Sequence, residues 1–223
     1  MSFFIGTSAE GDKFLTTAGY TALILLVIAL ILVGNAIFGK KKKFSALQLA
    51  YSAMGIALAT VLSLISIFHL PQGGSVTPCS MLFVVLIGYW FGPGVGFTTA
   101  IAYGALQLMI DPYILSIPQL LLDYIFAFGA LGLSGFFYKK QGKYSLIIAY
   151  LVAITGRFFF SFLSGVIFFG DFASASSFMG SVWYSITYNG SYIYAEGIIT
   201  VILLLIPAVR AGLNTVRNMA IKD

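Results

Sequence analysis

Seven apolar runs constrain this chain more strongly than any other feature, and the third and fourth of them are short enough to be tilted or partly re-entrant. Only 12 Lys and Arg and 7 Asp and Glu residues occur among its 223 residues, so 9% of the chain is charged, well below the roughly 25% of a typical soluble protein. So few charges cannot cover a water-facing globule, whereas a bilayer favours an apolar exterior and helices that pair their own backbone groups. The sequence therefore predicts an all-α membrane protein, with spans at 17–38, 45–68, 80–91, 94–110, 117–138, 144–169 and 182–207.

The loops between these runs divide the charges unevenly. If the lysine run at 40–43 is cytoplasmic, an alternating path places ten of the 12 basic residues on that side. The acidic loop residues Glu10, Asp12, Asp111 and Asp171 then all fall on the other side. The positive-inside rule accordingly predicts an N-terminus outside and a C-terminus inside, in a multi-pass protein of a cell membrane, most simply a prokaryotic plasma membrane.

The chain divides into two parts on this reading. Residues 1–43 form an extra transmembrane helix with a basic cytoplasmic loop, and residues 44–223 form a six-helix domain. A single Cys79 and a single His69 exclude an intramolecular disulfide and a zinc site. No P-loop motif is present, and no basic patch is interleaved with aromatic residues for nucleic acid. We expect the lipid bilayer as a partner, and no metal, cofactor or nucleic acid.

Three ionisable residues, Asp123, Arg157 and Glu196, remain inside the predicted spans. A charge at mid-helix costs at least about 2.5–3.5 kcal/mol, so each must be paired or face a polar cavity. Two arrangements meet this requirement. Either Arg157 pairs with Glu196 and leaves Asp123 free, or Arg157 reaches Asp123 and Glu196 has another partner. A purely structural ion pair is the alternative to a functional site.

Polar and aromatic residues gather near these charges. Arg157, Ser161, Gly165 and Phe169 recur every four residues and so share one helical face. The last span carries a second such group at Tyr184, Tyr188, Asn189, Ser191 and Tyr192. The spacing of Gly129, Gly132 and Gly135 favours close helix packing over a dinucleotide site. An enzyme is a poor hypothesis, because one His and one Cys supply no nucleophile and base pair.

Several ordered blocks of sequence carry a resemblance to a known family. They are LPQGGSVT at 70–77, DPY at 111–113, PQLLLDY at 118–124, AFGALGLSG at 127–135, SGVIFF at 164–169 and YSITYNGSY at 184–192. These blocks resemble the thiamine-specific substrate-binding S components, of ThiT type, of energy-coupling factor transporters. The resemblance covers about 45–210. It implies a six-helix bundle that binds thiamine on its outer side and docks on a membrane-embedded T component carrying two ATPase subunits.

The resemblance also implies roles for individual residues. Asp123 matches an acidic ligand for the thiazolium cation, and Arg157 falls where the family has a basic residue. Ala53 and Ala57 match a small-residue motif that contacts the T component. The remaining matches are aromatic or amide ligand positions at Tyr103, Tyr113, Tyr124, Tyr184 and Asn189.

Three positions depart from the family pattern. Ser161 stands where well-known members have a pocket His, Phe169 where they have a stacking Trp, and Gly74 where they have a loop Trp. These departures favour weaker thiamine binding or a related ligand among the phosphates and precursors of thiamine. The alternative function is a stand-alone transporter for thiamine or a related precursor, driven by protonation of Asp123 or Glu196.

Overall fold

The structure, a computed structural model, describes residues 5–7, 13–18, 21, 25, 44–140, 142–170 and 177–221. The predicted first span at 17–38 and the boundary at 43 lie almost entirely outside these residues. Five described helical segments are long and apolar enough to cross a membrane: Ala46–Ser63, Pro93–Ile110, Ile117–Phe137, Ser145–Phe168 and Phe178–Leu205. The structure is thus that of an all-α membrane protein, to which two short β-hairpins are added.

Most predicted spans correspond to helices with well-defined starts. Helix α2 (Ala46–Ser63) begins with a capping box, in which Gln48 N donates to Ser45 Oγ and Ser45 N donates to Gln48 Oε1, each over 3.1 Å. Helix α4 (Pro93–Ile110) starts with Pro93. Proline suits this position because the N–H groups of a first helical turn have no partner within the helix, so its missing N–H costs no hydrogen bond. Helix α7 (Ser145–Phe168) matches the sixth predicted span within one residue at each end.

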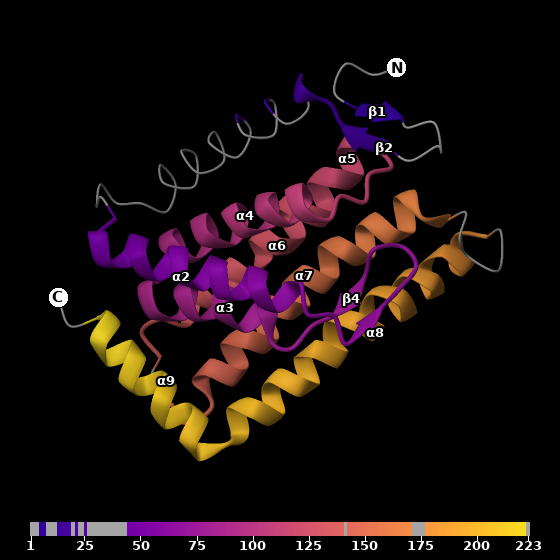
Figure 1. Ribbon diagram of the computed structural model, residues 1–223. Coiled ribbons are helices and arrows are strands. Elements are labelled where there is room, and N and C mark those ends of the chain that lie inside the picture. Colours follow the sequence, from indigo (N-terminus) through magenta and orange to yellow (C-terminus); the bar gives the residue numbers. More distant parts are fainter. Residues whose placement is uncertain are drawn as a thin grey trace.

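Helix α3 (Ser80–Phe91) has the predicted bounds but is enclosed by protein. Ten of its residues are buried. It packs against α2, α4, α7 and the helical segment Ala130–Phe137. Its 12 residues span only about 18 Å, which is shorter than the roughly 30 Å of a hydrocarbon core. In Figure 1, α3 lies beneath α2 within the bundle. It forms the centre of the hydrophobic core.

The predicted span at 117–138 is built from four helical pieces. They are α5 (Ile117–Leu120), the π-helix η1 (Leu121–Phe126), α6 (Ala127–Gly129) and the 3₁₀-helix η2 (Ala130–Phe137). With three residues per turn, a 3₁₀-helix aligns residues three apart, so Gly132 and Gly135 share a face. A Cβ on Gly132 would lie 2.7 Å from Phe97 Cα. The prediction of close helix packing by this glycine motif is confirmed.

The predicted span at 45–68 extends too far, because α2 ends at Ser63. The last residue of that span, Phe68, instead begins β3 (Phe68–His69), which pairs antiparallel with β4 (Ser75–Val76) in the register Phe68 to Val76 and His69 to Ser75. Ile67 N also donates to Val76 O over 2.9 Å. Apolar residues alone therefore did not distinguish a helix from a hairpin here. A second hairpin joins β1 (Ile5–Thr7) to β2 (Lys13–Leu15), with Ile5 opposite Leu15.

The last predicted span, 182–207, corresponds to the longer helix α8 (Phe178–Leu205) and a separate helix α9 (Pro207–Ala220). Ile206 has an extended ψ of 120°, and Pro207 then starts the new helix. Leu213 and Val216 of α9 pack against the main core. Figure 1 shows α9 and the C-terminus at the end of α8 that lies away from the β3–β4 hairpin.

Candidate ligand-binding site

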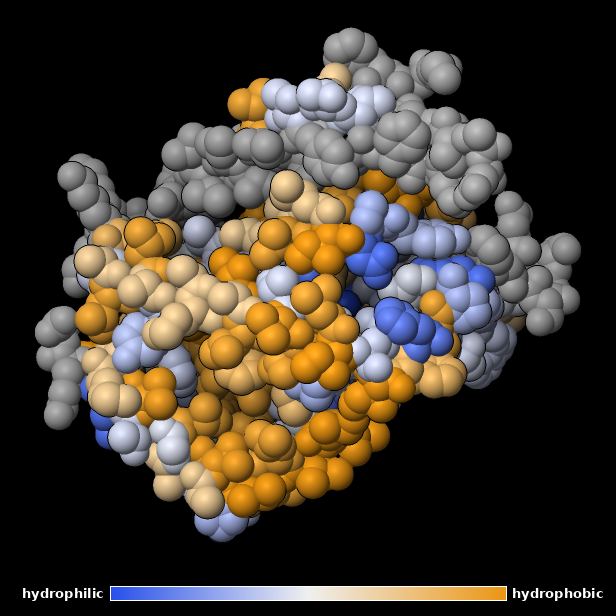
Figure 2. All heavy atoms as spheres, in the orientation of Figure 1, coloured by the Kyte–Doolittle hydropathy of each residue, from blue (hydrophilic) through white to orange (hydrophobic). Residues whose placement is uncertain are grey.

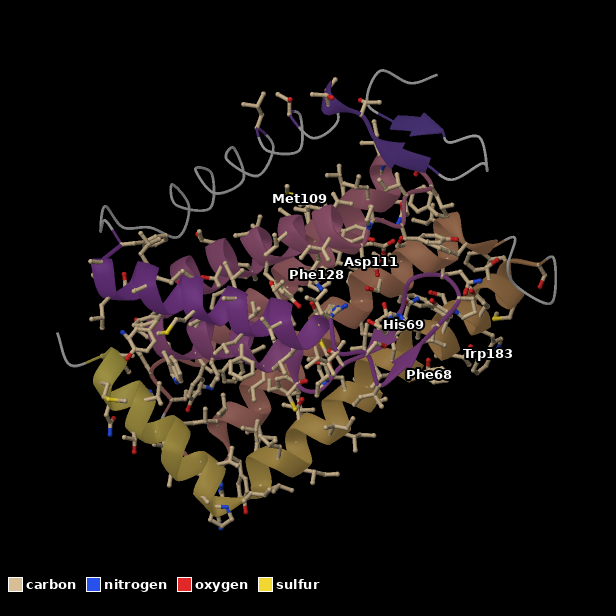
Figure 3. All side chains as sticks on the ribbon, in the orientation of Figure 1. Phe68, His69, Met109, Asp111, Phe128 and Trp183 are labelled. Carbon is tan, nitrogen blue, oxygen red and sulfur yellow. The ribbon has the colours of Figure 1, made fainter. Side chains whose placement is uncertain are left out.

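A cavity of about 350 Å³ opens between the β3–β4 hairpin, η1, α7 and α8. Figure 2 shows a mainly hydrophobic face on which hydrophilic residues gather around a hollow. In Figure 3, His69 lies on the hairpin and Phe128 lies deeper, within the bundle. The polar and aromatic residues that line the cavity include His69, Gln72, Gln107, Asp111, Tyr113, Gln119, Asp123, Tyr124, Phe128, Arg157, Ser161, Phe169, Tyr184, Tyr188, Asn189 and Tyr192.

The π-helix η1 carries Asp123 and Tyr124 to the cavity. Such π-turns frequently mark functional sites. Gln119 Nε2 donates to Asp123 Oδ2 over 2.6 Å, and Ser164 and Arg157 also lie near this carboxylate. The Tyr124 hydroxyl accepts from Tyr113 N over 2.8 Å and donates to Asp111 O over 2.9 Å. Tyr124 thus fixes the loop before α5, while Asp123 keeps acceptor capacity for a ligand.

Arg157 reaches the cavity from α7 without bonding to either intramembrane carboxylate. Its guanidinium carbon lies 4.1 Å from the centroid of the Phe128 ring and 6.0 Å from that of Tyr192. Its Nε is buried and has no hydrogen-bond partner among the described residues. Cation–π contacts of this kind contribute about 0.5–2 kcal/mol. The cavity therefore holds a positive charge whose Nε is free to bind.

Two stacked aromatic pairs form parts of the cavity wall. Tyr113 and Phe169 stack with centroids 5.7 Å apart and planes 23° apart. Tyr184 and Tyr188 stack at 5.6 Å and 20°. Partial burial raises the pKa of the Tyr113 phenol, which therefore stays neutral at physiological pH. The Tyr184 hydroxyl is buried without a hydrogen-bond partner in the described structure, so this wall offers both ring faces and a free hydroxyl.

Asn189 lies where α7 and α8 approach most closely. Its Nδ2 donates to Ser185 O over 3.1 Å, and its Oδ1 accepts from the Tyr192 hydroxyl over 3.0 Å. A Cβ on Gly165 would lie 3.0 Å from Asn189 Nδ2, so the glycine on α7 makes room for the amide. The predicted face of α7, with Arg157, Ser161, Gly165 and Phe169, does line the cavity.

Tyr188 also holds the hairpin that forms one wall. Its hydroxyl accepts from Gln72 N over 3.1 Å and from Gly74 N over 3.0 Å. A Cβ on Gly74 would lie 2.8 Å from the Tyr192 ring, so this arrangement leaves no space for a larger residue at position 74. At Gly73, φ is +85°, a conformation that favours glycine.

Glu196 has partners that neither sequence alternative named. The Thr77 hydroxyl donates to Oε2 over 2.6 Å, the Ser80 hydroxyl donates to Oε1 over 3.1 Å and Met81 N donates to Oε1 over 2.8 Å. These donors surround the first turn of α3, whose free N–H groups favour a negative charge. The pairing of Arg157 with Glu196 is therefore wrong, and a hydrogen bond from Arg157 to Asp123 is not present either.

Eight of the nine residues predicted to bind the substrate line the cavity: Tyr113, Asp123, Tyr124, Arg157, Ser161, Phe169, Tyr184 and Asn189. The exception is Tyr103, which is fully buried and packs edge-on against Phe128 with centroids 5.3 Å apart. It lies behind the wall, because Phe128 occupies the position facing the cavity. Ala53 and Ala57 lie on the exposed face of α2, far along the chain from these residues.

Two cavity-lining residues, Gln119 and Phe128, were not predicted from the sequence, although their spacing from Asp123 and Tyr124 could have indicated them. Gln119 lies four residues before Asp123, on the same helical face, and joins it to the loop through Leu115 N, which donates to Gln119 Oε1 over 3.0 Å. Phe128 follows Tyr124 by the same spacing. His69 lies on the hairpin and also lines the cavity.

Comparisons with known proteins agree with this geometry. The family described as "Thiamine transporter protein (Thia_YuaJ)" matches residues 49–214. "Thiamine transporter ThiT" from Bacillus subtilis (strain 168) is 36% identical over 167 residues, covering 68% of this chain and 85% of that protein. A solved structure of ThiT from Listeria monocytogenes superposes with a TM-score of 0.60 at 26% identity, covering 73% of this chain and 96% of the other. The chain belongs to the thiamine transporter protein family.

Proposed function

We propose that this multi-pass membrane protein is the thiamine-binding S component of an energy-coupling factor transporter and captures the vitamin in the cavity beside η1. One observation carries the proposal: a membrane-embedded cavity combines an open carboxylate, Asp123, with two stacked aromatic pairs. Thiamine is a cation with two aromatic rings. An anion and aromatic faces are the groups that recognise such a ligand.

Each side of the cavity has its own part in recognition. Asp123 binds the thiazolium cation, and the pair Tyr113 and Phe169 or the pair Tyr184 and Tyr188 supplies ring faces for the aminopyrimidine. The free Tyr184 hydroxyl and the Arg157 Nε bind the polar atoms of the ligand, because buried polar atoms without partners destabilise the empty site. The protein performs no chemistry, which agrees with membership of a transporter family.

The orientation follows from where the charges lie in the fold. Arg210 Nη1 donates to Lys143 O and Arg217 Nη2 donates to Tyr138 O, each over 3.5 Å. The basic residues of α9 and of the loop before α7 therefore gather at one end of the bundle, while Asp111 lies at the cavity. With that basic end in the cytoplasm, the cavity faces outward. We infer seven spans, with residues 1–43 as an extra helix and 44–223 as the six-helix domain.

The exposed face of α2 is the proposed docking surface for the T component. Ala53 and Ala57 lie there beside the exposed Leu49, Met54 and Leu58. Small residues let a partner helix approach closely in a membrane. Two ATPase subunits bound to the T component supply the energy for uptake.

Calorimetric titration of the purified protein tests the proposal directly. Thiamine should bind with a 1:1 stoichiometry, whereas the separate neutral pyrimidine precursor should bind at least about 10-fold more weakly, since it lacks the charge that Asp123 recognises. Titrations with thiamine phosphates rank the remaining ligands. Absence of thiamine binding by the folded protein would contradict the proposal.

Uptake into liposomes tests the partners. We expect accumulation of thiamine only when the T component and both ATPase subunits are present with ATP. Uptake by the chain alone that collapses with the proton gradient would instead support the stand-alone transporter. The variant Ala53→Leu tests the docking surface on α2. It should abolish assembly with the T component and uptake, while thiamine binding by the chain itself stays unchanged.

A further inference from the structure

The β3–β4 hairpin forms one wall of the cavity, and α8 holds it at two separate places. His69, Gln72, Gly73, Gly74 and Ser75 line the cavity. Near the turn, the Tyr188 hydroxyl accepts from two hairpin amides, at 3.1 and 3.0 Å. Two backbone hydrogen bonds close the turn itself, Leu70 N to Gly74 O at 2.7 Å and Gly73 N to Leu70 O at 3.3 Å. A two-stranded hairpin is marginally stable alone, so its position depends on such external contacts.

The second attachment is at the base of the hairpin. Thr77 follows β4 directly, and its hydroxyl donates to Glu196 over 2.6 Å. Ser80 and Met81 N donate to the same carboxylate, at 3.1 and 2.8 Å. Glu196 is eight residues beyond Tyr188 on α8, so both side chains lie on one face of the helix. That face therefore fixes the turn and the base of the wall together.

Glu196 is not required by the ligand itself. It is 2% exposed and is not among the residues that line the cavity. A buried carboxyl group with three donors from one short segment is a strong tether, because a buried donor that loses its acceptor costs about 1–3 kcal/mol. An amide at this position offers one acceptor oxygen in place of two, so the Thr77 and Ser80 hydroxyls and Met81 N cannot all keep their partner.

We propose that Glu196 is a positioning residue that tethers the base of the hairpin and thereby sets how fast a bound ligand leaves the cavity. It acts through Thr77 and the first turn of α3, not by contact with the ligand. When the tether is weakened, the wall formed by residues 69–75 moves away from the cavity more often, and the ligand escapes more rapidly. The identity of the ligand rests on the proposed function, but the tether does not.

Hydrogen–deuterium exchange of the ligand-free full chain tests the tether. In Glu196→Gln, the hydrogen-bonded amides of Ile67 and Leu70 should exchange at least about 10-fold faster than in the parent protein. Tyr150→Phe is the matched control: it removes another buried hydrogen bond, from the Tyr150 hydroxyl to Thr200 Oγ1 at 3.0 Å, one turn further along α8. Tyr150→Phe should leave exchange in the hairpin unchanged. Equal exchange in Glu196→Gln and Tyr150→Phe would overturn the proposal.

The dissociation rate of thiamine tests the consequence. We expect Glu196→Gln to raise this rate about 10-fold and Thr77→Val to raise it about 3- to 10-fold, whereas Tyr150→Phe changes it less than 2-fold. The double variant should dissociate no faster than Glu196→Gln alone, because both changes break the same contact. If Glu196→Gln fails to fold, Thr77→Val alone decides.

Three results would overturn the proposal: an unchanged rate in Thr77→Val, additive effects in the double variant, or faster hairpin exchange with no change in dissociation. A parent protein that does not bind thiamine would overturn the proposed function instead. The exchange experiment would still test the tether in that case, because it needs no ligand.

Discussion

The cavity and the contact between η2 and α4 are built from similarly apolar stretches of sequence but differ in how they are filled. The cavity leaves space and polar atoms without partners in the described part of the chain, whereas the helix contact is closely packed. Around the cavity, Arg157 Nε and the Tyr184 hydroxyl are buried without partners among the described residues. In the contact between η2 and α4, glycines bring the backbones together, and Leu131 and Tyr103 are fully buried. The first region keeps space and free polar atoms for a ligand, whereas the second is closed by packing.

The two intramembrane carboxylates show the same contrast at the level of single residues. Glu196 accepts from three donors around the start of α3 and does not line the cavity, while Asp123 accepts from Gln119 and does line it. A charge inside a membrane helix therefore does not by itself identify a ligand site. A place on the lining of the cavity is the further criterion, and it makes Asp123 rather than Glu196 the candidate.

The largest effect should come from removing the open charge. Asp123→Asn is expected to weaken thiamine binding about 10- to 100-fold, because a hydrogen bond to a charged group contributes about 1.5–3 kcal/mol. Calorimetric titration measures the change. Asp111→Asn is the matched control, since it makes the same charge change at an exposed position of the cavity. Equal losses in the two variants would show that Asp123 has no special role.

In the packed region, Gly132→Ala should destabilise the fold. Its Cβ would lie 2.7 Å from both Phe97 Cα and Phe97 N, and a backbone cannot give way as a flexible side chain does. Overpacking of this kind costs about 1–3 kcal/mol in the free energy of unfolding. Thermal denaturation of the purified protein measures it. Unchanged stability would mean that this contact is looser than the structure shows.

A smaller effect is expected for the aromatic wall. Phe169→Leu keeps an apolar side chain but removes the stack with Tyr113, so thiamine affinity should fall about 2- to 10-fold, in line with 0.5–1.5 kcal/mol for an aromatic pair. Phe159→Leu on the exposed face of α7 should leave affinity unchanged. If Phe159→Leu weakened binding as much as Phe169→Leu, the assignment of the wall would fail.

The smallest effect concerns a glycine that packing does not require. No atom lies within 4 Å of a Cβ built on Gly212 in α9. Gly212→Ala should therefore raise the free energy of unfolding by about 0.5–1 kcal/mol, because alanine loses less backbone entropy in a helix. The same denaturation experiment compares it with Gly132→Ala. Destabilisation by both alanines would remove the distinction between the two glycines.

Much of the fold and of the cavity could be predicted from the sequence. The sequence predicted helices α4 and α7 and both ends of α3, because apolar runs are bounded there by glycine, proline and charged residues. Two of the residues that line the cavity, Asp123 and Arg157, could be predicted because charged residues are rare in such apolar surroundings. The hairpin at residues 68–76 was missed, since an apolar run has no periodicity that separates a short strand from a helix end.

Charge scarcity, apolar run length and ordered motifs are local properties, and they were enough to identify this chain as a membrane protein that resembles the thiamine transporter family. Which of the three intramembrane charges line the cavity depends on the tertiary structure. Glu196 meets Met81 across 115 positions of the chain, and Tyr103 is separated from the cavity by Phe128. Both outcomes depend on how helices distant in sequence pack together, which no local pattern encodes.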